Sequence, residues 1–216
     1  MIQIVKDTDT NPLFFLQTAH TTYGIRVMNT GHLEHLYYGE RITVVSQDPS
    51  SCAPLVIQRA FAPGNTCTYD REHPQISMED VCLEVGTLGK GDIREPFLEV
   101  RFADGSVTSD FTFDSYEIIT LKEREQCLQD SGLPHSYSEA GTDSAECLKI
   151  VLQDVTNHLE FQLFYTVFEE CDVITRSARL INHSDASVTL DRCLSAQLDL
   201  TEDYSVITHF SGAWAR

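Results

Sequence analysis

The stretch Leu159-Glu-Phe-Gln-Leu-Phe-Tyr-Thr-Val-Phe168 decides the fold class, because its large apolar side chains recur at every second position. The residues on this apolar face are Leu159, Phe161, Leu163, Tyr165 and Val167, and the opposite face carries Glu160 and Gln162. Successive side chains of a β-strand point to opposite faces of the sheet. A period of two therefore predicts a half-buried strand.

The same alternation extends in both directions along the chain. Residues 147–155 place Leu148, Ile150 and Leu152 on one face. One parity of residues 188–200, interrupted by Arg192, carries the apolar side chains Val188, Leu190, Leu194, Ala196, Leu198 and Leu200. Toward the N-terminus, residues 13–16, 23–27 and 33–37 are also typical of strands, and residues 29–31 have the composition of a turn.

Shorter signals complete the expected fold. Residues 97–102, followed by Asp104-Gly105 and residues 106–108, predict a hairpin with an Asp-Gly turn. A short helix is expected over residues 77–83, where Ser77 is a candidate N-cap. Residues 47–74 and 86–96 fit neither pattern and are expected to be long loops. The sequence thus predicts a single antiparallel all-β domain, residues 1–216, built from two packed sheets.

Charge excludes several classes of partner. The formal net charge is −18, from 15 basic and 33 acidic side chains, and it repels nucleic acids and anionic membrane surfaces. It does not oppose a neutral ligand such as a sugar. The N-terminus lacks the pattern of a signal peptide, and no apolar run is long enough to span a bilayer, so we expect a cytoplasmic protein without membrane contact.

Cysteine and histidine usage does not predict a metal site. The seven cysteines are widely spaced, without a C-x-x-C motif, and several lie in apolar runs, so we expect reduced thiols. His32 and His35 would share one face of a helix, but on the expected strand they point to opposite faces. We therefore expect neither a metal nor a cofactor.

Two charged stretches resemble functional motifs only superficially. The glycines around Lys90 lack the spacing of a phosphate-binding loop, and Asp92 would repel phosphate, so a turn between strands is favoured. For Asp92 and Arg94 a structural ion pair is favoured over a binding role. Residues 169–172 are expected to form a solvated hairpin tip. Arg176 and Arg179 are expected to pair with its acids or with a second protein surface.

The loop Asp70-Arg-Glu-His-Pro74 carries the candidate ligand-contacting residues. Arg71 and His73 can donate hydrogen bonds to hydroxyl groups, and Asp70 can accept them, which suits a polyol. An ordinary solvated loop is the competing interpretation.

The C-terminal residues 210–216 have the composition of a strand interior. Trp214, the only tryptophan, lies two residues from the end, although a large aromatic side chain favours burial. We therefore expect this chain to be part of a longer protein.

Five strings together resemble the N-terminal domain of family 36 α-galactosidases. They are His35-Leu-Tyr-Tyr-Gly39, Arg59-Ala-Phe-Ala-Pro63, Gly89-Lys-Gly-Asp-Ile-Arg-Glu-Pro96, Tyr165-Thr-Val-Phe-Glu-Glu-Cys-Asp-Val-Ile-Thr-Arg-Ser-Ala-Arg179 and Ser211-Gly-Ala-Trp-Ala-Arg216. Their order and spacing fit across essentially the whole chain, and the fourth string is long enough to be specific.

The resemblance implies a β-supersandwich that precedes a catalytic (β/α)₈ barrel and a C-terminal β-domain. Both catalytic aspartates of this retaining glycosidase chemistry belong to the barrel, so no catalytic residue is expected here. The enzyme would hydrolyse α-galactosides of the raffinose or melibiose type. The resemblance also implies a homo-oligomer in which a loop, here residues 58–74, shapes the rim of the active site. We call this segment the rim loop, and its candidate sugar contacts are Asp70, Arg71 and His73.

Two departures from the family pattern affect this loop. Gln58 stands where many relatives carry an acidic residue, and the loop after it is longer here. Two other functions remain open. A free-standing carbohydrate-binding module would use exposed aromatic side chains, with Tyr37, Tyr38, Tyr69 and Trp214 as candidates. A pure interaction domain would make no sugar contact.

Overall fold

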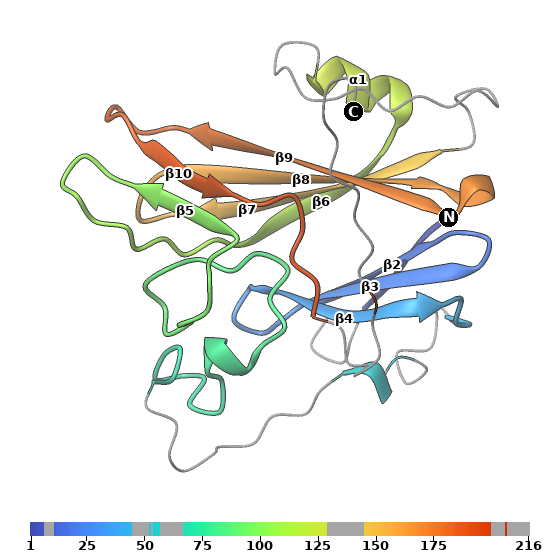
Figure 1. Cartoon of the computed structure of the whole chain (residues 1–216), viewed down its shortest axis with the longest axis horizontal. Coiled ribbons are helices and arrows are strands. Elements are labelled where there is room, and N and C mark those ends of the chain that lie inside the picture. Colours follow the sequence, from blue (N-terminus) through green and yellow to red (C-terminus); the bar gives the residue numbers. More distant parts are fainter. Residues whose placement is uncertain are drawn as a thin grey trace, which may run out of the picture.

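The computed structural model describes residues 1–6, 11–44, 52, 54–56, 67–128, 145–199 and 206. These residues form two four-stranded antiparallel sheets and one two-stranded antiparallel sheet (Figure 1). The prediction of an all-β fold with packed antiparallel sheets is confirmed. The rim-loop residues 58–66 and the C-terminal string at 210–216 lie outside the described residues.

The first sheet is a meander built from the N-terminal residues. Its strands, in spatial and sequence order, are β1 (Ile2–Lys6), β2 (Pro12–Gln17), β3 (Thr21–Val27) and β4 (Leu33–Glu40). All six residues of β2 are buried, because both faces of this strand are covered. Phe14 faces the main core, whereas Phe15 packs in a separate cluster with Val5, Leu13 and Cys52.

A bulge in this sheet changes which side chains of β4 share a face. Ile25 pairs with His35, but Gly24 pairs with Tyr37, so one extra residue of β4 lies between them. Tyr38 consequently lies opposite Tyr23 on the face that carries His35, and Tyr37 lies on the other face with Gly24. The tyrosine rings of residues 23 and 38 meet edge to face, with their centroids 5.8 Å apart.

The second four-stranded sheet contains the stretch that decided the fold class. Its strands are β6 (Thr112–Thr120), β7 (Glu146–Asp154), β8 (Leu159–Phe168) and β9 (Val173–Asn182), in that order. The predicted alternation of β8 is confirmed, since all five residues of its apolar face are buried. The helix α1 (Leu121–Leu128), which the sequence pattern did not predict, follows β6 directly.

The two-stranded sheet corrects two expectations. Its strands β5 (Leu98–Arg101) and β10 (Thr189–Cys193) pair with each other although they are far apart in sequence. The Asp-Gly turn forms, with a positive φ at Gly105, but residues 106–108 are not a strand, so the predicted hairpin is wrong. The alternation over residues 188–199 does not correspond to one continuous strand, because β10 has five residues, with a bulge between Leu190 and Arg192.

Two short segments form single 3₁₀ turns. The expected helix after Ser77 is the single turn η2 (Met78–Asp80), and Ser77 makes no side-chain cap. The tip between β8 and β9 is η3 (Glu169–Cys171), which confirms the predicted hairpin tip. None of the helices in the described part of the chain has the length and hydrophobicity that crossing a bilayer requires.

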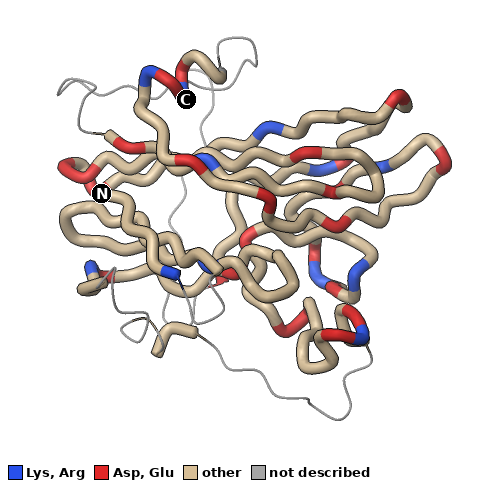
Figure 2. The backbone as a smooth tube through the Cα atoms, turned by 180° about the vertical axis from the view of Figure 1, so that it is seen from behind, with Lys and Arg blue, Asp and Glu red and all other residues tan. Residues whose placement is uncertain are grey.

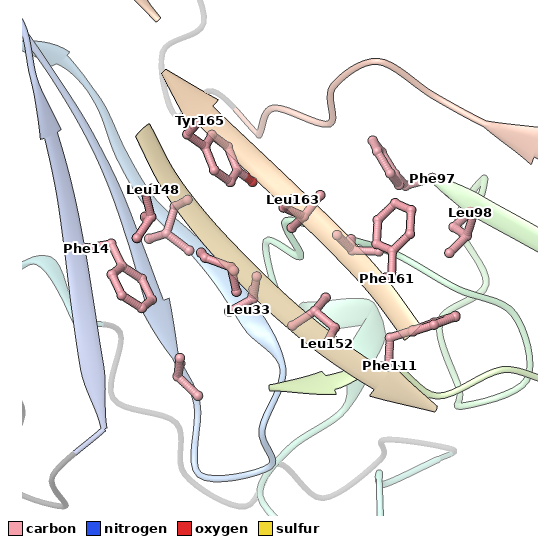
Figure 3. Packing of buried hydrophobic residues seen from close by; sticks show 14 of the residues in the cluster. Phe14, Leu33, Phe97, Leu98, Phe111, Leu148, Leu152, Phe161, Leu163 and Tyr165 are labelled. Atoms are coloured by element: carbon pink, nitrogen blue, oxygen red, sulfur yellow. The ribbon is translucent and has the colours of Figure 1, made fainter. Parts of the chain in front are cut away.

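The main core lies between the two four-stranded sheets and extends under β5. Phe14 and Leu33 from the first sheet face Leu148 and Leu152 from the second (Figure 3). Phe161 is fully buried against the rings of Phe97 and Phe111, at centroid distances of 6.2 and 5.8 Å (Figure 3). Val85 and Phe97, from the loop segment 67–97, belong to this core, so the packing between the layers holds that segment in position.

Candidate functional site

The described part of the rim loop is a tight turn held together by Asp70. Asp70 Oδ1 accepts hydrogen bonds from the backbone nitrogens of Glu72 and His73, at 2.8 and 2.7 Å. The Nδ1 atom of His73 lies 2.9 Å from the same oxygen. Burial opposes ionisation, but the hydrogen bonds from His73 and Glu72 together outweigh it and lower the pKa of Asp70. This carboxylate therefore shapes the turn.

The three candidate sugar contacts therefore differ in how free their side chains are to bind a ligand. The structure brings Asp70 and His73 together, whereas Arg71 is exposed on the turn between them. Glu72, next to Arg71, is exposed as well. Arg71 is the candidate whose charged group is best placed to meet a ligand from solvent.

Asp110 anchors the rim loop to the sandwich. The hydroxyl of Tyr69 donates to Asp110 Oδ2 at 3.0 Å, and Lys90 Nζ lies 2.9 Å from the same oxygen. His32 Nε2 lies 3.0 Å from Asp110 Oδ1, and the rings of His32 and Tyr69 meet edge to face at 4.9 Å. These groups come from four separate segments of the chain, so one carboxylate fixes their relative positions.

The ionisation of this cluster follows from those contacts. Burial alone would raise the pKa of Asp110, but the hydrogen bonds from His32 and Lys90 lower it to about 2, from an ordinary value of 3.8. Burial and the neighbouring carboxylate of Asp110 both raise the pKa of Tyr69, so its hydroxyl remains a donor. The cluster is thus a stable arrangement of an ionised acceptor and its donors.

The glycine-containing loop is structural. Gly89 and Gly91 have φ values of 96° and 89°, the left-handed region that favours glycine, and Lys90 between them reaches Asp110. The predicted ion pair between Asp92 and Arg94 is confirmed, with Arg94 Nε 2.9 Å from Asp92 Oδ1. Arg94 also donates to the carbonyl oxygens of Met78 and Val81, which holds η2 in place.

The two histidines considered for metal binding have different surroundings. His32 contacts Asp110, while the ring of His35 packs 4.9 Å from that of Tyr23. Burial lowers the pKa of His35. Within the described ranges, no group of three or more His, Cys, Asp or Glu side chains is placed to hold a metal ion. The described cysteines are free thiols.

A second polar cluster is buried between the sheets and centres on Glu84. The fully buried carboxylate of Glu84 accepts hydrogen bonds from the hydroxyls of Tyr23 and Tyr165, both at 2.6 Å. Arg176 Nη2 lies 3.3 Å from Glu84 Oε1 and donates to the carbonyl oxygen of Glu84 at 3.1 Å. The guanidinium group of Arg176 also lies 4.6 Å from the ring centroid of Phe97. We call Glu84, Tyr23, Tyr165 and Arg176 the Glu84 cluster.

The Glu84 cluster corrects the proposed pairing of Arg176. The acids at the β8–β9 tip are not its partners, because Arg176 points inward on the core-facing parity of β9. Its burial opposes the charged form, but the neighbouring Tyr165 and Glu84 outweigh this effect and raise the pKa of Arg176. At the tip, Glu169 instead pairs with Arg41 and the N-terminal amine, and Asp172 pairs with His20.

Sequence reasoning did not identify the residues of these two clusters. A signal for the Glu84 cluster existed, because Glu84 interrupts the apolar run Val81-Cys-Leu-Glu-Val85, and Arg176 shares its strand parity with Ile174 and Leu180. A charge on a core-facing parity predicts a buried partner of opposite charge. No comparable signal marked Asp110, since its partners come from three other segments.

Charged residues are spread along the described part of the chain. Figure 2 shows acidic residues spread over strands and turns around the molecule, with basic residues interspersed among them.

Comparison with known proteins identifies relatives over nearly the whole chain. The family profile described as "Glycosyl hydrolase family 36 N-terminal domain" matches residues 31–216. The chain is 34% identical to the bifunctional α-galactosidase/sucrose kinase AgaSK of Mediterraneibacter gnavus, over 94% of this chain and 20% of that protein. It is also 34% identical to the α-galactosidase AgaA of Geobacillus stearothermophilus, over 94% of this chain and 26% of that protein.

Solved structures of α-galactosidases resemble the fold of this chain. The α-galactosidase of Lactobacillus brevis superimposes with a TM-score of 0.77 at 33% identity, over 91% of this chain and 25% of that one. A variant of Geobacillus stearothermophilus AgaA in complex with raffinose superimposes with a TM-score of 0.72 at 30% identity, over 85% of this chain and 24% of that one. The chain therefore spans about a quarter or less of the length of these relatives.

The Asp110 anchor predicts a specific dependence of stability on pH. The pKa of Asp110 is lower in the folded protein than the ordinary 3.8, so its contribution is complete above about pH 4 and is lost as the pH falls toward 2. The free energy of unfolding of the unmodified chain should exceed that of Asp110→Asn by roughly 2 kcal/mol at pH 6. Urea unfolding followed by circular dichroism measures this difference, which should shrink between pH 4 and pH 2.5.

Asp185→Asn, at an exposed turn, is the matched control. It should change the free energy of unfolding by less than about 0.5 kcal/mol at either pH. A difference for Asp110→Asn that is unchanged between pH 6 and pH 2.5 would contradict this account of the anchor.

Proposed function

Because the chain belongs to the glycosyl hydrolase family 36 N-terminal domain family, we propose that it forms the non-catalytic N-terminal domain of an α-galactosidase. The observation that carries the proposal is the match over residues 31–216, together with relatives of which the chain covers about a quarter or less. The complete enzyme would be a cytoplasmic retaining hydrolase of terminal α-galactosides of the raffinose or melibiose type. No catalytic residue is assigned within this chain.

The proposed role of the domain is structural. It packs against the catalytic barrel, supports assembly into a homo-oligomer and places the rim loop at the entrance of the active site. Support for the last point is that Asp110 anchors Tyr69 of this loop to the sandwich, and that hydrogen bonds to Asp70 fix the shape of the adjacent turn. An anchored turn presents the exposed Arg71 in a defined position at a small entropic cost.

Two other functions are less well supported. A carbohydrate-binding module that uses Tyr37, Tyr38 and Tyr69 as one platform does not fit, because Tyr37 and Tyr38 lie on opposite faces of the first sheet and Tyr69 lies in the Asp110 anchor. A pure interaction domain remains as the alternative if the rim loop has no effect on kinetics.

The proposal predicts where hydrolytic activity resides. The 216-residue chain should not hydrolyse p-nitrophenyl α-galactoside above the rate without protein, because the retaining mechanism needs two carboxylates that this account places in the barrel. The product of the complete reading frame should hydrolyse it with saturation kinetics. Release of p-nitrophenol is measured by absorbance, and clear turnover by the 216-residue chain would refute the assignment.

The rim role predicts a selective effect of Arg71 in the complete enzyme. Arg71→Gln should raise KM for raffinose by about two- to tenfold, the effect of losing one hydrogen bond to the substrate, and leave kcat nearly unchanged. Lys122→Gln removes another exposed charge, from α1, and serves as the control. Equal kinetics for the unmodified enzyme and both variants would favour the interaction-domain alternative.

A further inference from the structure

Apolar side chains are exposed along residues 189–198, on the side of the sandwich where β10 and the segment after it lie. Leu190, Leu194 and Leu198 are 48%, 41% and 46% exposed. These leucines belong to the apolar parity of residues 188–200. Single apolar side chains scattered over a surface are ordinary, whereas several of them along one segment indicate an interface.

The register of β10 shows that part of this surface belongs to the core-facing side of the sheet. Residues directly opposite each other in an antiparallel pair lie on the same face. Leu190 lies opposite Val100 and, because of the bulge, Cys193 lies opposite Leu98. Val100 and Leu98 are fully buried in the main core, whereas Leu190 and Cys193 are exposed. The core-facing side of β10 is therefore not covered by the described residues.

β9 contributes half-buried apolar residues from the other layer. Ile174, Ala178 and Leu180, on its core-facing parity, pack against the main core but keep part of their surface exposed. Within the described part of the chain β9 pairs only with β8, and β10 pairs only with β5. Both are thus edge strands, and an edge strand with exposed apolar side chains is unfavourable unless another segment covers it.

A pocket of about 180 Å³ lies between β9 and the segment after β10. Its apolar lining comes from β4, β9 and that segment, and includes Tyr38, Ile174, Ala196 and Leu198. The charged groups of its described lining already have partners in this chain, since Arg176 pairs with Glu84 and Asp172 pairs with His20. An apolar cavity of about 150 Å³ accommodates benzene, so this pocket has room for one large apolar side chain.

We propose that an apolar segment of the complete protein, from outside residues 1–216, covers β9 and β10 on this side and inserts a large side chain into the pocket. The inference rests on the proposed function in one respect, namely that this chain is part of a longer enzyme. The chain spans 20% and 26% of the length of the two α-galactosidases AgaSK and AgaA, which supports that premise. A covalently linked segment has a high local concentration, which favours it over a free partner.

Labelling of native cysteines with N-ethylmaleimide, followed by peptide mass spectrometry, tests the proposal without any substitution. Cys193 lies on β10, and Cys127, which is exposed on α1, is the internal control. The labelling rate of Cys193 should be about tenfold lower, or less, in the complete protein than in the 216-residue chain, whereas the rate of Cys127 should differ by less than about threefold. An unchanged rate at Cys193, or equal falls at both cysteines, would overturn the proposal.

Two further measurements separate this inference from its alternatives. A labelling rate of Cys193 that falls as the concentration of the 216-residue chain rises would show that a second copy covers the surface, and would overturn the proposal. Hydrolysis of p-nitrophenyl α-galactoside is measured on the same complete protein. An inactive protein that protects Cys193 would refute the enzymatic assignment and support this interface. An active enzyme that leaves Cys193 as reactive as in the 216-residue chain would do the reverse.

Substitutions then test whether the covering segment binds through apolar contacts. Leu190→Ser should raise the labelling rate of Cys193 in the complete protein by about tenfold, because the loss of apolar contact favours release of the segment. The same substitution should change this rate by less than about threefold in the 216-residue chain. Val155→Ser removes a more exposed aliphatic group from the turn after β7 and is the matched control. Circular dichroism checks that the variants are folded, and equal rates for both variants in the complete protein would overturn the proposal.

Discussion

The architecture depends on one buried carboxylate. Glu84 lies in a segment without regular strands, yet it accepts hydrogen bonds from Tyr23 in the first sheet and Tyr165 in the second, and it pairs with Arg176 on β9. A buried charge must be compensated, so these partners fix how the two sheets face each other. The same contacts orient both tyrosines and the arginine, so one carboxylate fixes the side chains at the junction of the two sheets.

The strands of the fold were predictable where one face is buried and the other is solvated. β7 alternates in burial for this reason, as does the first half of β8, whereas Phe164 and Thr166 on the other face of β8 are also buried. The pattern around residues 188–200 failed because alternation predicts a strand but not its partner or its length. β10 pairs with the distant β5, and Leu190, Leu194 and Leu198 remain partly exposed. The bulge in β4 could not be predicted either, because one extra residue moves the following side chains to the other face of the sheet without changing the local composition.

The candidate sites were predictable only in part. The Asp70–His73 contact and the Asp92–Arg94 pair each join residues that are close in sequence, so local composition can suggest them. The Asp110 anchor joins segments up to 78 residues apart, and the Glu84–Arg176 contact joins residues 92 apart. Local spacing cannot predict such contacts. The family resemblance supplied the fold and the relation to a larger enzyme, but not these internal contacts.

A double-mutant cycle on Glu84→Gln and Arg176→Met tests the central role of the Glu84 cluster most directly. Urea unfolding should show that each single substitution lowers the free energy of unfolding by about 3 kcal/mol or more, because each leaves a buried polar group without its partner. The double variant should lose less than the sum of the two, with a coupling energy of roughly 1–3 kcal/mol. Losses that add to within about 0.5 kcal/mol would contradict the account.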